Sequence, residues 1–175
     1  LADQGGLRAD SGHERGGTSR YPIDIVEALM ATVGGQLAVR ASADDVRSAS
    51  EWIEQICSEH DVPAEQILRL DLCLNEALGN IILHGGPSAL EAPVHLVLEI
   101  KANGRHAQAE LSVSDTGKAF NPLTAVAKHQ ALMLADATPG GLGLTMINGY
   151  SDRLDYNFHE GRNHLTYFVQ WDESD

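Results

Sequence analysis

Residues 64–86 read AEQILRLDLCLNEALGNIILHGG, and this stretch decides how the chain folds. Apolar residues recur in it at helical spacing, and those that share one face are Ile67, Leu70, Leu74, Leu78 and Ile81. Such a stripe predicts a helix from about Ala64 to Leu83 that packs against a core. A second apolar set indicates a helix buried on two sides, namely Leu68, Leu72 and Leu83. The Gly85-Gly86-Pro87 run predicts where the helix stops.

Three polar residues interrupt this apolar helix. Glu76, Asn80 and His84 each follow four positions after the last, which on a helix lines them along one edge. The oxygen of Asn80 suits Mg²⁺, which favours oxygen ligands and keeps several waters. A carboxylate one turn away can accept a proton from a hydroxyl or a water. An ordinary polar edge with satisfied hydrogen bonds explains the helix equally well, so further motifs are needed.

The residues before this helix differ from it in composition and in predicted structure. Residues 1–20 are rich in Gly, Ser and charge, which is typical of a disordered tail or linker. We expect a short extension over 21–35, with a helix over 22–34 that ends at Gly34-Gly35, and a folded domain over 36–175. Gln36 to Ala41 alternate as a strand. Ser42 or Asp44 then caps a helix from about Asp45 to Glu59.

Downstream, two hairpins are predicted. Strands over 94–100 and 107–114 flank Asn103-Gly104, a strong turn signal, and strands over 153–159 and 165–171 flank a turn at 160–163. Between the hairpins, residues 118–140 show little regular pattern, which indicates a functional loop such as a lid. This order predicts a two-layer α/β (α+β) sandwich, with a mostly antiparallel, mixed sheet and about three helices on one face.

The composition restricts the class of protein. The chain has 175 residues, of which 43% are hydrophobic, so one domain with its own core is expected. The net charge of -13 argues against direct nucleic-acid binding, because the phosphate backbone would be repelled. No signal peptide or membrane-spanning run of about 18 apolar residues is seen, so we expect a cytoplasmic protein without a membrane partner. Cys57 and Cys73 lack metal-ligand spacing and are expected to be reduced core thiols.

Two further motifs follow the helix in the chain. Asp115-Thr116-Gly117 stands at the end of a predicted strand, where a carboxylate can accept a hydrogen bond from an exocyclic amine. Gly140-Gly141-Leu142-Gly143-Leu144 opens a predicted helix, whose exposed amides can hold phosphates. Each motif alone is weak, since an ordinary turn or a Gly-rich loop looks the same. No GxxxxGK[ST] run is present, so this is not a P-loop protein.

In combination and in this order, the motifs resemble those of the GHKL ATPases, which share the Bergerat α/β sandwich. Within that superfamily, the segment LCLNEALGNIILHG at 72–85 looks most like the anti-sigma-factor serine/threonine kinases. The same is true of VSDTGKAFNP at 113–122, GGLGLTMINGYSDRLDYNF at 140–158 and NHLTYFV at 163–169. The resemblance covers roughly residues 36–171.

The resemblance implies a role for each matching residue. Asn80 would coordinate a Mg²⁺ ion that bridges the phosphates of ATP, and Glu76 would be the general base that activates the substrate serine. Asp115 would bind the adenine amino group, while Gly117 would leave room for the ring. His84 would lie near the phosphates or the ribose.

The remaining site residues of the resemblance lie in the two Gly motifs. Gly141 and Gly143, with Leu142 and Leu144 beside them, would contact the nucleotide phosphates. Two departures from the family pattern concern nucleotide binding. In the first Gly motif the family often reads Asp-x-Gly-x-Gly, but here the fifth position is Ala119. Just before the second Gly motif the family often has Arg, where this chain has Thr138-Pro139. Cationic compensation could come from Lys118, Lys128 or His129.

The resemblance implies a function. The domain would bind Mg-ATP, phosphorylate a STAS-type anti-sigma-factor antagonist and sequester a sigma factor, so that transcription is regulated by partner switching; a homodimer is plausible. A binding module with little or no turnover is the alternative that Ala119 and the absent Arg motivate. The chain could also be the last domain of a longer response-regulator or phosphatase protein. The catalytic domain of a histidine kinase is disfavoured, because no phospho-accepting helical hairpin precedes residue 36.

Overall fold

The computed structural model describes residues 31–123 and 149–172. Their elements, in chain order, are β1 (Ala31–Val39), α2 (Ala43–Glu59), α3 (Ala64–His84), α4 (Pro87–Glu91), β2 (Val94–Asn103), β3 (His106–Asp115), β4 (Arg153–His159) and β5 (Arg162–Asp172).

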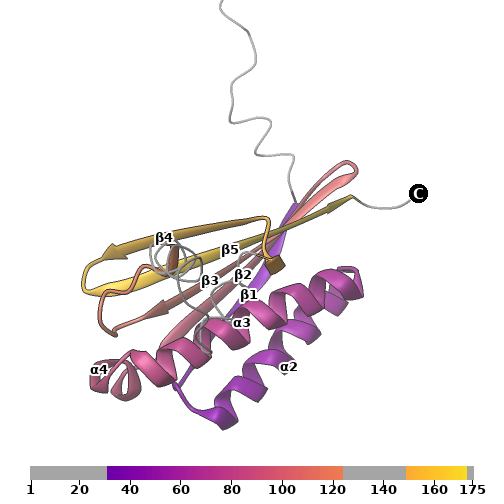
Figure 1. Cartoon of the computed structure of the whole chain (residues 1–175). Coiled ribbons are helices and arrows are strands. Elements are labelled where there is room, and N and C mark those ends of the chain that lie inside the picture. The colour runs from indigo at the N-terminus through magenta and orange to yellow at the C-terminus, as the bar shows by residue number, and fades with distance from the viewer. Residues whose placement is uncertain (1–30, 124–148, 173–175) are drawn as a thin grey trace, which may run out of the picture.

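The strands form one sheet in the order β1-β2-β3-β5-β4, and every neighbouring pair in this described part is antiparallel. Helices α2 and α3 lie side by side on one face of the sheet, and α4 follows at the end of α3 (Figure 1). Helix α2 packs under β1, whereas α3 packs under β3 and β5. The predicted two-layer α/β sandwich is therefore confirmed.

Alternating side chains of the strands build the core between sheet and helices. On β2 and β3 the buried positions alternate with half-buried or exposed ones, as expected for a sheet with one covered face. Side chains that are almost fully buried come from both layers, including Leu96, Leu98, Leu111, Val113, Ile53, Leu70, Leu74 and Leu78. Burying each such side chain stabilises the fold by roughly 1.5–3 kcal/mol.

The ends of the long helices follow local rules. Ser42, one of the two predicted caps, accepts a hydrogen bond from the Asp45 backbone N–H at 3.3 Å and begins α2. Helix α3 ends at His84, where the Gly85 N–H still donates to the Ile81 carbonyl at 2.9 Å. The predicted stop at Gly85-Gly86 is confirmed, but Pro87 then starts the short helix α4, which sequence analysis missed.

The first strand corrects an expectation. A helix was expected over 22–34, within an extension over 21–35, yet residues 31–35 belong to β1. Residues 22–30 lie outside the described part. Gly34 has φ +152 and pairs with β2, and a Cβ there would lie 1.9 Å from the Leu98 carbonyl oxygen. Glycine is thus required inside the strand because the neighbouring backbone occupies the space of a side chain.

Helix α3 is also less buried than its two apolar sets suggested. The first set, from Ile67 to Ile81, faces the core, but Leu68 and Leu83 are 58% and 74% exposed. Only two layers exist in the described part, so a helix below the sheet has one covered side.

Candidate nucleotide site between helix and sheet

A cavity of about 220 Å³ lies between the second half of α3 and the ends of β3, β4 and β5. Its polar lining comes from helix, strands and the segment after β3, namely Asn80, His84, Asp115, Lys118, Tyr156 and Asn163. Ala77, Val113, Phe120 and Leu165 supply apolar surface. A small apolar cleft with a few convergent polar groups is the usual form of a small-molecule site.

The cavity brings together several of the residues singled out by sequence. Asn80, His84, Asp115 and Ala119 all line it, although the chain separates the first and last by 39 positions. Glu76 does not line it, whereas its neighbour Ala77 does. The helical rise of about 1.5 Å per residue places Glu76 one turn beyond Asn80. Gly141, Leu142, Gly143 and Leu144 lie outside the described residues, as do most of the predicted lid, Lys128 and His129.

Asp115 forms the buried end of the cavity. Its side chain, on a residue only 7% exposed, accepts at Oδ1 a hydrogen bond from the Gly117 N–H at 2.7 Å and another from Asn163 Nδ2 at 3.1 Å. Within residues 31–123 and 149–172, no hydrogen bond reaches Oδ2. The second oxygen of a buried carboxylate is therefore available to a donor group of a ligand.

Gly117 lets the segment after β3 approach the end of α3. A Cβ at this position would lie 2.9 Å from the Gly85 carbonyl oxygen and 2.7 Å from Asp115 Oδ1. The next residue fixes the contact, because the Lys118 N–H donates to the same Gly85 carbonyl at 3.2 Å. The glycine thus allows the backbone after β3 to pack against the end of α3 beside the cavity.

Asn163 is a residue that sequence analysis missed as part of the site. It was assigned to a turn, but it lies in β5, is 6% exposed and faces the cavity. Its partners are up to 48 positions away in the chain, so local sequence carried no signal of them. Only the pairing of β3 with β5, which sets Asp115 opposite Asn163, reveals the contact.

The polar edge of α3 is available for a ligand. In the described part of the chain, Glu76, Asn80 and His84 make no hydrogen bond or ion pair, although Glu76 and Asn80 are half-buried. By contrast Asn75, on the same helix, donates to Asp71 at 2.9 Å and to Ser50 at 3.3 Å. These observations disfavour the alternative of an edge with satisfied hydrogen bonds.

Glu76 acts electrostatically on the core beneath it. Burial raises the pKa of Tyr167 well above its ordinary value, and the nearby Cys73 and Glu76 add to the effect. The Tyr167 hydroxyl is the one buried side-chain polar atom without a hydrogen bond in the described residues. Burial also raises the pKa of Cys57 and of Cys73 to about 12, so both remain protonated thiols, free and buried as predicted.

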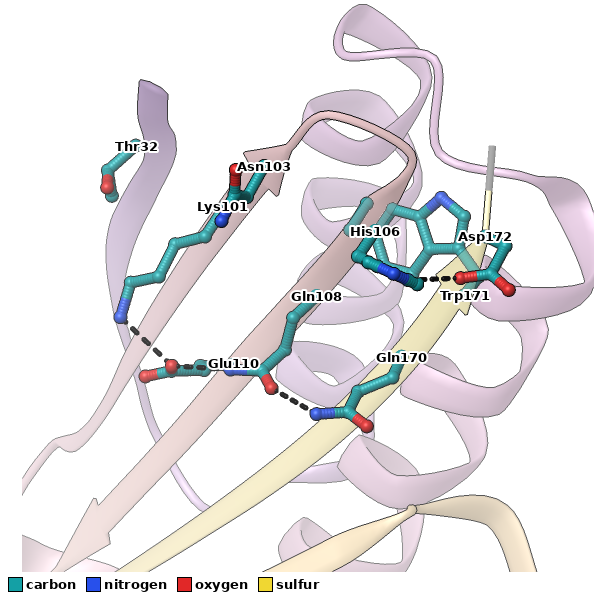
Figure 2. A pocket seen from close by; sticks show the side chains of 10 residues that line it. Thr32, Lys101, Asn103, His106, Gln108, Glu110, Gln170, Trp171 and Asp172 are labelled. Carbon is teal, nitrogen blue, oxygen red and sulfur yellow. Dashed lines mark hydrogen bonds and ion pairs between the residues drawn. The ribbon is translucent and has the colours of Figure 1, made fainter. Parts of the chain in front are cut away.

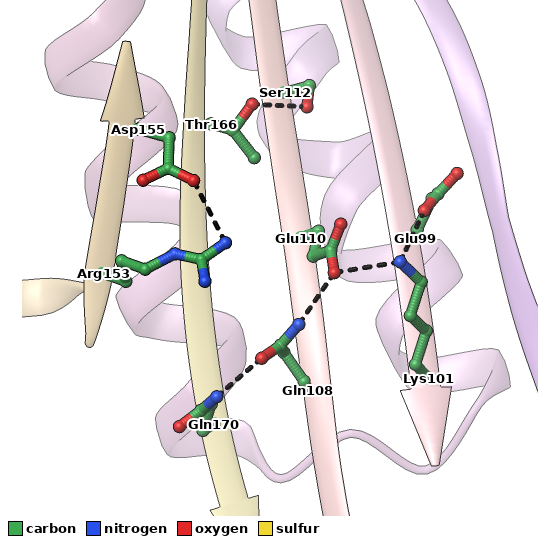
Figure 3. Close-up of polar contacts among 9 residues, drawn as sticks. All are labelled: Glu99, Lys101, Gln108, Glu110, Ser112, Arg153, Asp155, Thr166 and Gln170. Carbon is green, nitrogen blue, oxygen red and sulfur yellow. Dashed lines mark hydrogen bonds and ion pairs between the residues drawn. The ribbon is translucent and has the colours of Figure 1, made fainter. Parts of the chain in front are cut away.

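A larger and more open groove, of about 800 Å³, lies on the opposite side of the sheet (Figure 2). Its side chains already pair with one another, since Lys101 contacts Glu110 at 2.9 Å and Gln108 links Glu110 to Gln170. Figure 3 shows how this chain of contacts crosses three strands. A solvated polar face with internally satisfied groups explains this groove, so the smaller cavity is the candidate site.

A metal ion at this site would need further coordinating oxygens from a bound ligand or from water. Among the described residues, no group of three His, Cys, Asp or Glu side chains could hold a metal. The unpaired oxygen of Asn80 in the cavity nevertheless fits Mg²⁺, which often takes one or two protein oxygens together with waters and substrate phosphates. None of the described helices has the length and apolar character needed to span a bilayer.

Comparison with known proteins agrees with this geometry. The model of the histidine kinase-like ATPase domain matches residues 39–168, so the chain belongs to that family. Its resemblance to the anti-sigma-factor kinase branch of the GHKL superfamily is confirmed.

One relative is the serine/threonine-protein kinase BtrW of Bordetella bronchiseptica, 32% identical over 130 residues, which are 74% of this chain and 89% of that protein. The fold is shared with the crystal structure of the RsbU and RsbW domains of Rv1364c from Mycobacterium tuberculosis, at a TM-score of 0.59 and 13% identity. That match covers 81% of this chain but 33% of the other, so this chain spans about a third of that protein.

Proposed function

We propose that this domain is a serine/threonine-protein kinase that uses Mg-ATP to phosphorylate a STAS-type anti-sigma-factor antagonist. In the same proposal, it sequesters a sigma factor when the antagonist is phosphorylated, because the added charge weakens the competing contact. The observation that carries the proposal is the convergence of Asn80, His84 and Asp115 on one cavity, in a chain related to a serine/threonine kinase.

The two ends of the cavity suit the two ends of ATP. The open Oδ2 of Asp115 would accept a hydrogen bond from the amino group of adenine, and the apolar wall of Val113 and Leu165 would contact the ring. Asn80 and His84 would face the ribose and phosphates further along α3. A Mg²⁺ ion held by Asn80 would neutralise phosphate charge, which is the main need of phosphoryl transfer. Lys118, which lines the cavity, would supply a cation in place of the absent Arg.

Glu76 would accept the proton of the substrate hydroxyl. As that proton leaves, the hydroxyl oxygen forms a bond to the γ-phosphorus, and the bond from the γ-phosphorus to the bridging oxygen of ADP breaks. The products are phosphoserine or phosphothreonine and ADP. Two observations support this role. In the described part of the chain, Glu76 makes no hydrogen bond that would compete for its carboxylate. It also lies one helical turn from Asn80, next to the cavity lining but not in it.

The test is ATP binding measured by calorimetry with and without Mg²⁺. Wild type is expected to bind more tightly with Mg²⁺, and Asn80→Ala is expected to lose this difference. Asn75→Ala is the matched control, since it removes the same amide from the same helix outside the cavity. Equal affinities of wild type and Asn80→Ala in both conditions would remove the metal role of Asn80.

The second candidate is a binding module that turns over little ATP. Ala119 favours it, because its methyl group lines the cavity where the family often has Gly. Incubation with labelled ATP and a purified STAS-domain antagonist separates the two. Transfer of label to the antagonist supports the kinase, whereas partner binding without transfer, unchanged in Glu76→Ala, supports the module.

A further inference from the structure

The side-chain amide of Asn163 joins three separate parts of the cavity wall. Its Nδ2 lies 3.1 Å from Asp115 Oδ1, 3.3 Å from the Gly117 carbonyl and 3.1 Å from the Lys118 carbonyl. Its Oδ1 accepts from the Tyr156 hydroxyl at 2.8 Å and from the Phe120 N–H at 3.2 Å. Strand β5 thereby holds both β4 and the segment that follows β3.

These neighbours permit one orientation of the amide. All three groups around Nδ2 are oxygens, and both groups around Oδ1 are donors, so a rotated amide would place oxygen against oxygen and nitrogen against N–H. Burial raises the pKa of Tyr156, and the charge of Asp115 adds to it, so the hydroxyl remains a donor. The direction of the Asn163 amide is therefore set by its surroundings.

The fixed Asn163 amide determines which oxygen of Asp115 remains able to accept a hydrogen bond from a ligand. Two N–H groups, from Asn163 and Gly117, donate to Oδ1 and hold the carboxylate in one orientation. The carboxylate cannot rotate without breaking both bonds, so Oδ2 stays directed away from them. The oxygens of a carboxylate are hydrogen-bond acceptors. A ligand group that donates is therefore favoured at this end of the cavity over one that accepts.

We propose that Asn163 is the positioning residue that makes the cavity selective for a purine carrying an amino group at the Asp115 end. This inference rests on the proposed function, since it concerns how the same site recognises adenine. Asn163 acts through Asp115, because its hydrogen bond holds the carboxylate that would accept from the base. Its bonds to Gly117, Lys118 and Phe120 also hold the backbone beside that carboxylate.

The experiment compares two nucleotides that differ in one group. ATP carries the amino group, whereas purine riboside triphosphate lacks it, and both have the same phosphates. We expect wild type to bind ATP at least about tenfold more tightly than the analogue. The analogue has no amino group, so the Asp115 carboxylate would lose its hydrogen-bond donor when the analogue is bound. In Asn163→Ala, the ratio of the two affinities is expected to fall below about threefold, as Asp115 becomes free to turn to water or to the exposed backbone groups.

Two other variants keep the test decisive. Tyr156→Phe removes one donor to Asn163 with little change of shape, and we expect it to lower the ratio in part. Asn157→Ala is the matched control, since Asn157 is exposed on the same hairpin and outside the cavity lining, and its ratio should equal that of wild type. If Asn163→Ala does not fold, as judged by its thermal transition, Tyr156→Phe carries the test.

The outcomes separate this inference from the function on which it rests. A wild type that binds neither nucleotide overturns both. A wild type that prefers ATP, with the same preference in Asn163→Ala and Tyr156→Phe, overturns the role of Asn163 and leaves the ATP site in place. Equal loss of affinity for ATP and for the analogue also overturns it, because a purely structural residue would weaken both alike.

Discussion

The cavity has two walls that are prepared in different ways. The strand wall, at Asp115 and Asn163 with Gly117 behind them, is fixed by hydrogen bonds within the protein, five of them on the Asn163 amide alone. On the helix wall, Asn80 and His84 make no such bond within the described residues, and neither does Glu76 one turn further along α3.

Under the proposed function, this difference suits each wall to a different part of Mg-ATP. A flat base needs a fixed acceptor at a fixed distance, so a rigid strand wall lowers the cost of ordering when the base binds. Phosphates and a hydrated cation bring their own charge and ligands, so side chains free to reorient are suited to them. Changes to the helix wall should therefore affect chemistry without affecting stability, whereas changes to the strand wall should affect both affinity and stability.

The largest effect is expected on the helix side. Glu76→Gln should lower the rate of phosphoryl transfer by about 10²- to 10⁴-fold, the usual contribution of a general base. The ATP dissociation constant and the melting temperature should stay close to wild type, because Glu76 makes no hydrogen bond in the described part of the chain. Single-turnover transfer of labelled phosphate measures the rate, with the exposed Glu65→Gln on the same helix as control. Transfer at the wild-type rate would exclude Glu76 as the base.

On the strand wall, Asp115→Asn should weaken ATP binding by about 10- to 100-fold, as a charged hydrogen bond contributes roughly 1.5–3 kcal/mol. The new amide would turn its oxygen to the Gly117 and Asn163 donors and present N–H groups to the base. GTP, with an acceptor at the same position, should therefore lose less affinity than ATP. Asp155→Asn, at an exposed aspartate of β4, is the control. Equal losses for ATP and GTP would contradict base recognition by Asp115.

Two glycines sharpen the comparison. Gly117→Ala should destabilise the protein by about 1–3 kcal/mol, because its Cβ would overlap the Gly85 carbonyl and Asp115. Gly79→Ala, in the interior of α3, meets nothing within 4 Å and should stabilise by up to about 1 kcal/mol through helix propensity. Urea unfolding of both variants measures the difference. If Gly117→Ala were as stable as wild type, the close contact of the two walls would not exist.

Beneath the helix wall, Tyr167→Phe should leave stability at neutral pH unchanged or raise it by about 1 kcal/mol, because the buried hydroxyl has no partner among the described residues. The folded pKa of Tyr167 lies above its ordinary 10.0, so above that pH the unfolded chain ionises first and stability falls as pH rises. The variant should lack this part of the alkaline loss, measured by urea unfolding between neutral pH and pH 11. A marked loss of stability at neutral pH would reveal a partner for the hydroxyl.

The smallest effect is expected on the open face of the sheet, outside both walls. Lys101→Met should change stability by less than about 1 kcal/mol, since pairs with Glu99 and Glu110 near the surface contribute little. The hydrogen bond with Glu110 raises the pKa of Lys101 above 10.5, so its contribution is complete below that pH and is lost at higher pH. ATP affinity should be unchanged, and a change would give the open face a role in binding.

The sequence by itself determined the sandwich, both hairpins and the polar edge of α3, and it limited the cap of α2 to Ser42 or Asp44. These features depend on residues a few positions apart, where helical or strand periodicity and turn chemistry act directly. The start of β1 was mispredicted because Gly34 resembles a helix stop, and only the nearby Leu98 carbonyl explains a glycine in a strand. The exposure of Leu83 was missed because local periodicity does not show how many layers cover a helix.

The tertiary structure alone decided how the cavity is closed. Asn163 reaches Asp115 only because β3 and β5 pair in one register, and a shift by one residue would turn it to the other face of the sheet. Likewise, Gly117 is required because the chain from β3 passes over the end of α3. Such contacts join positions 32 to 48 residues apart, and their energies depend on distances that no local pattern encodes.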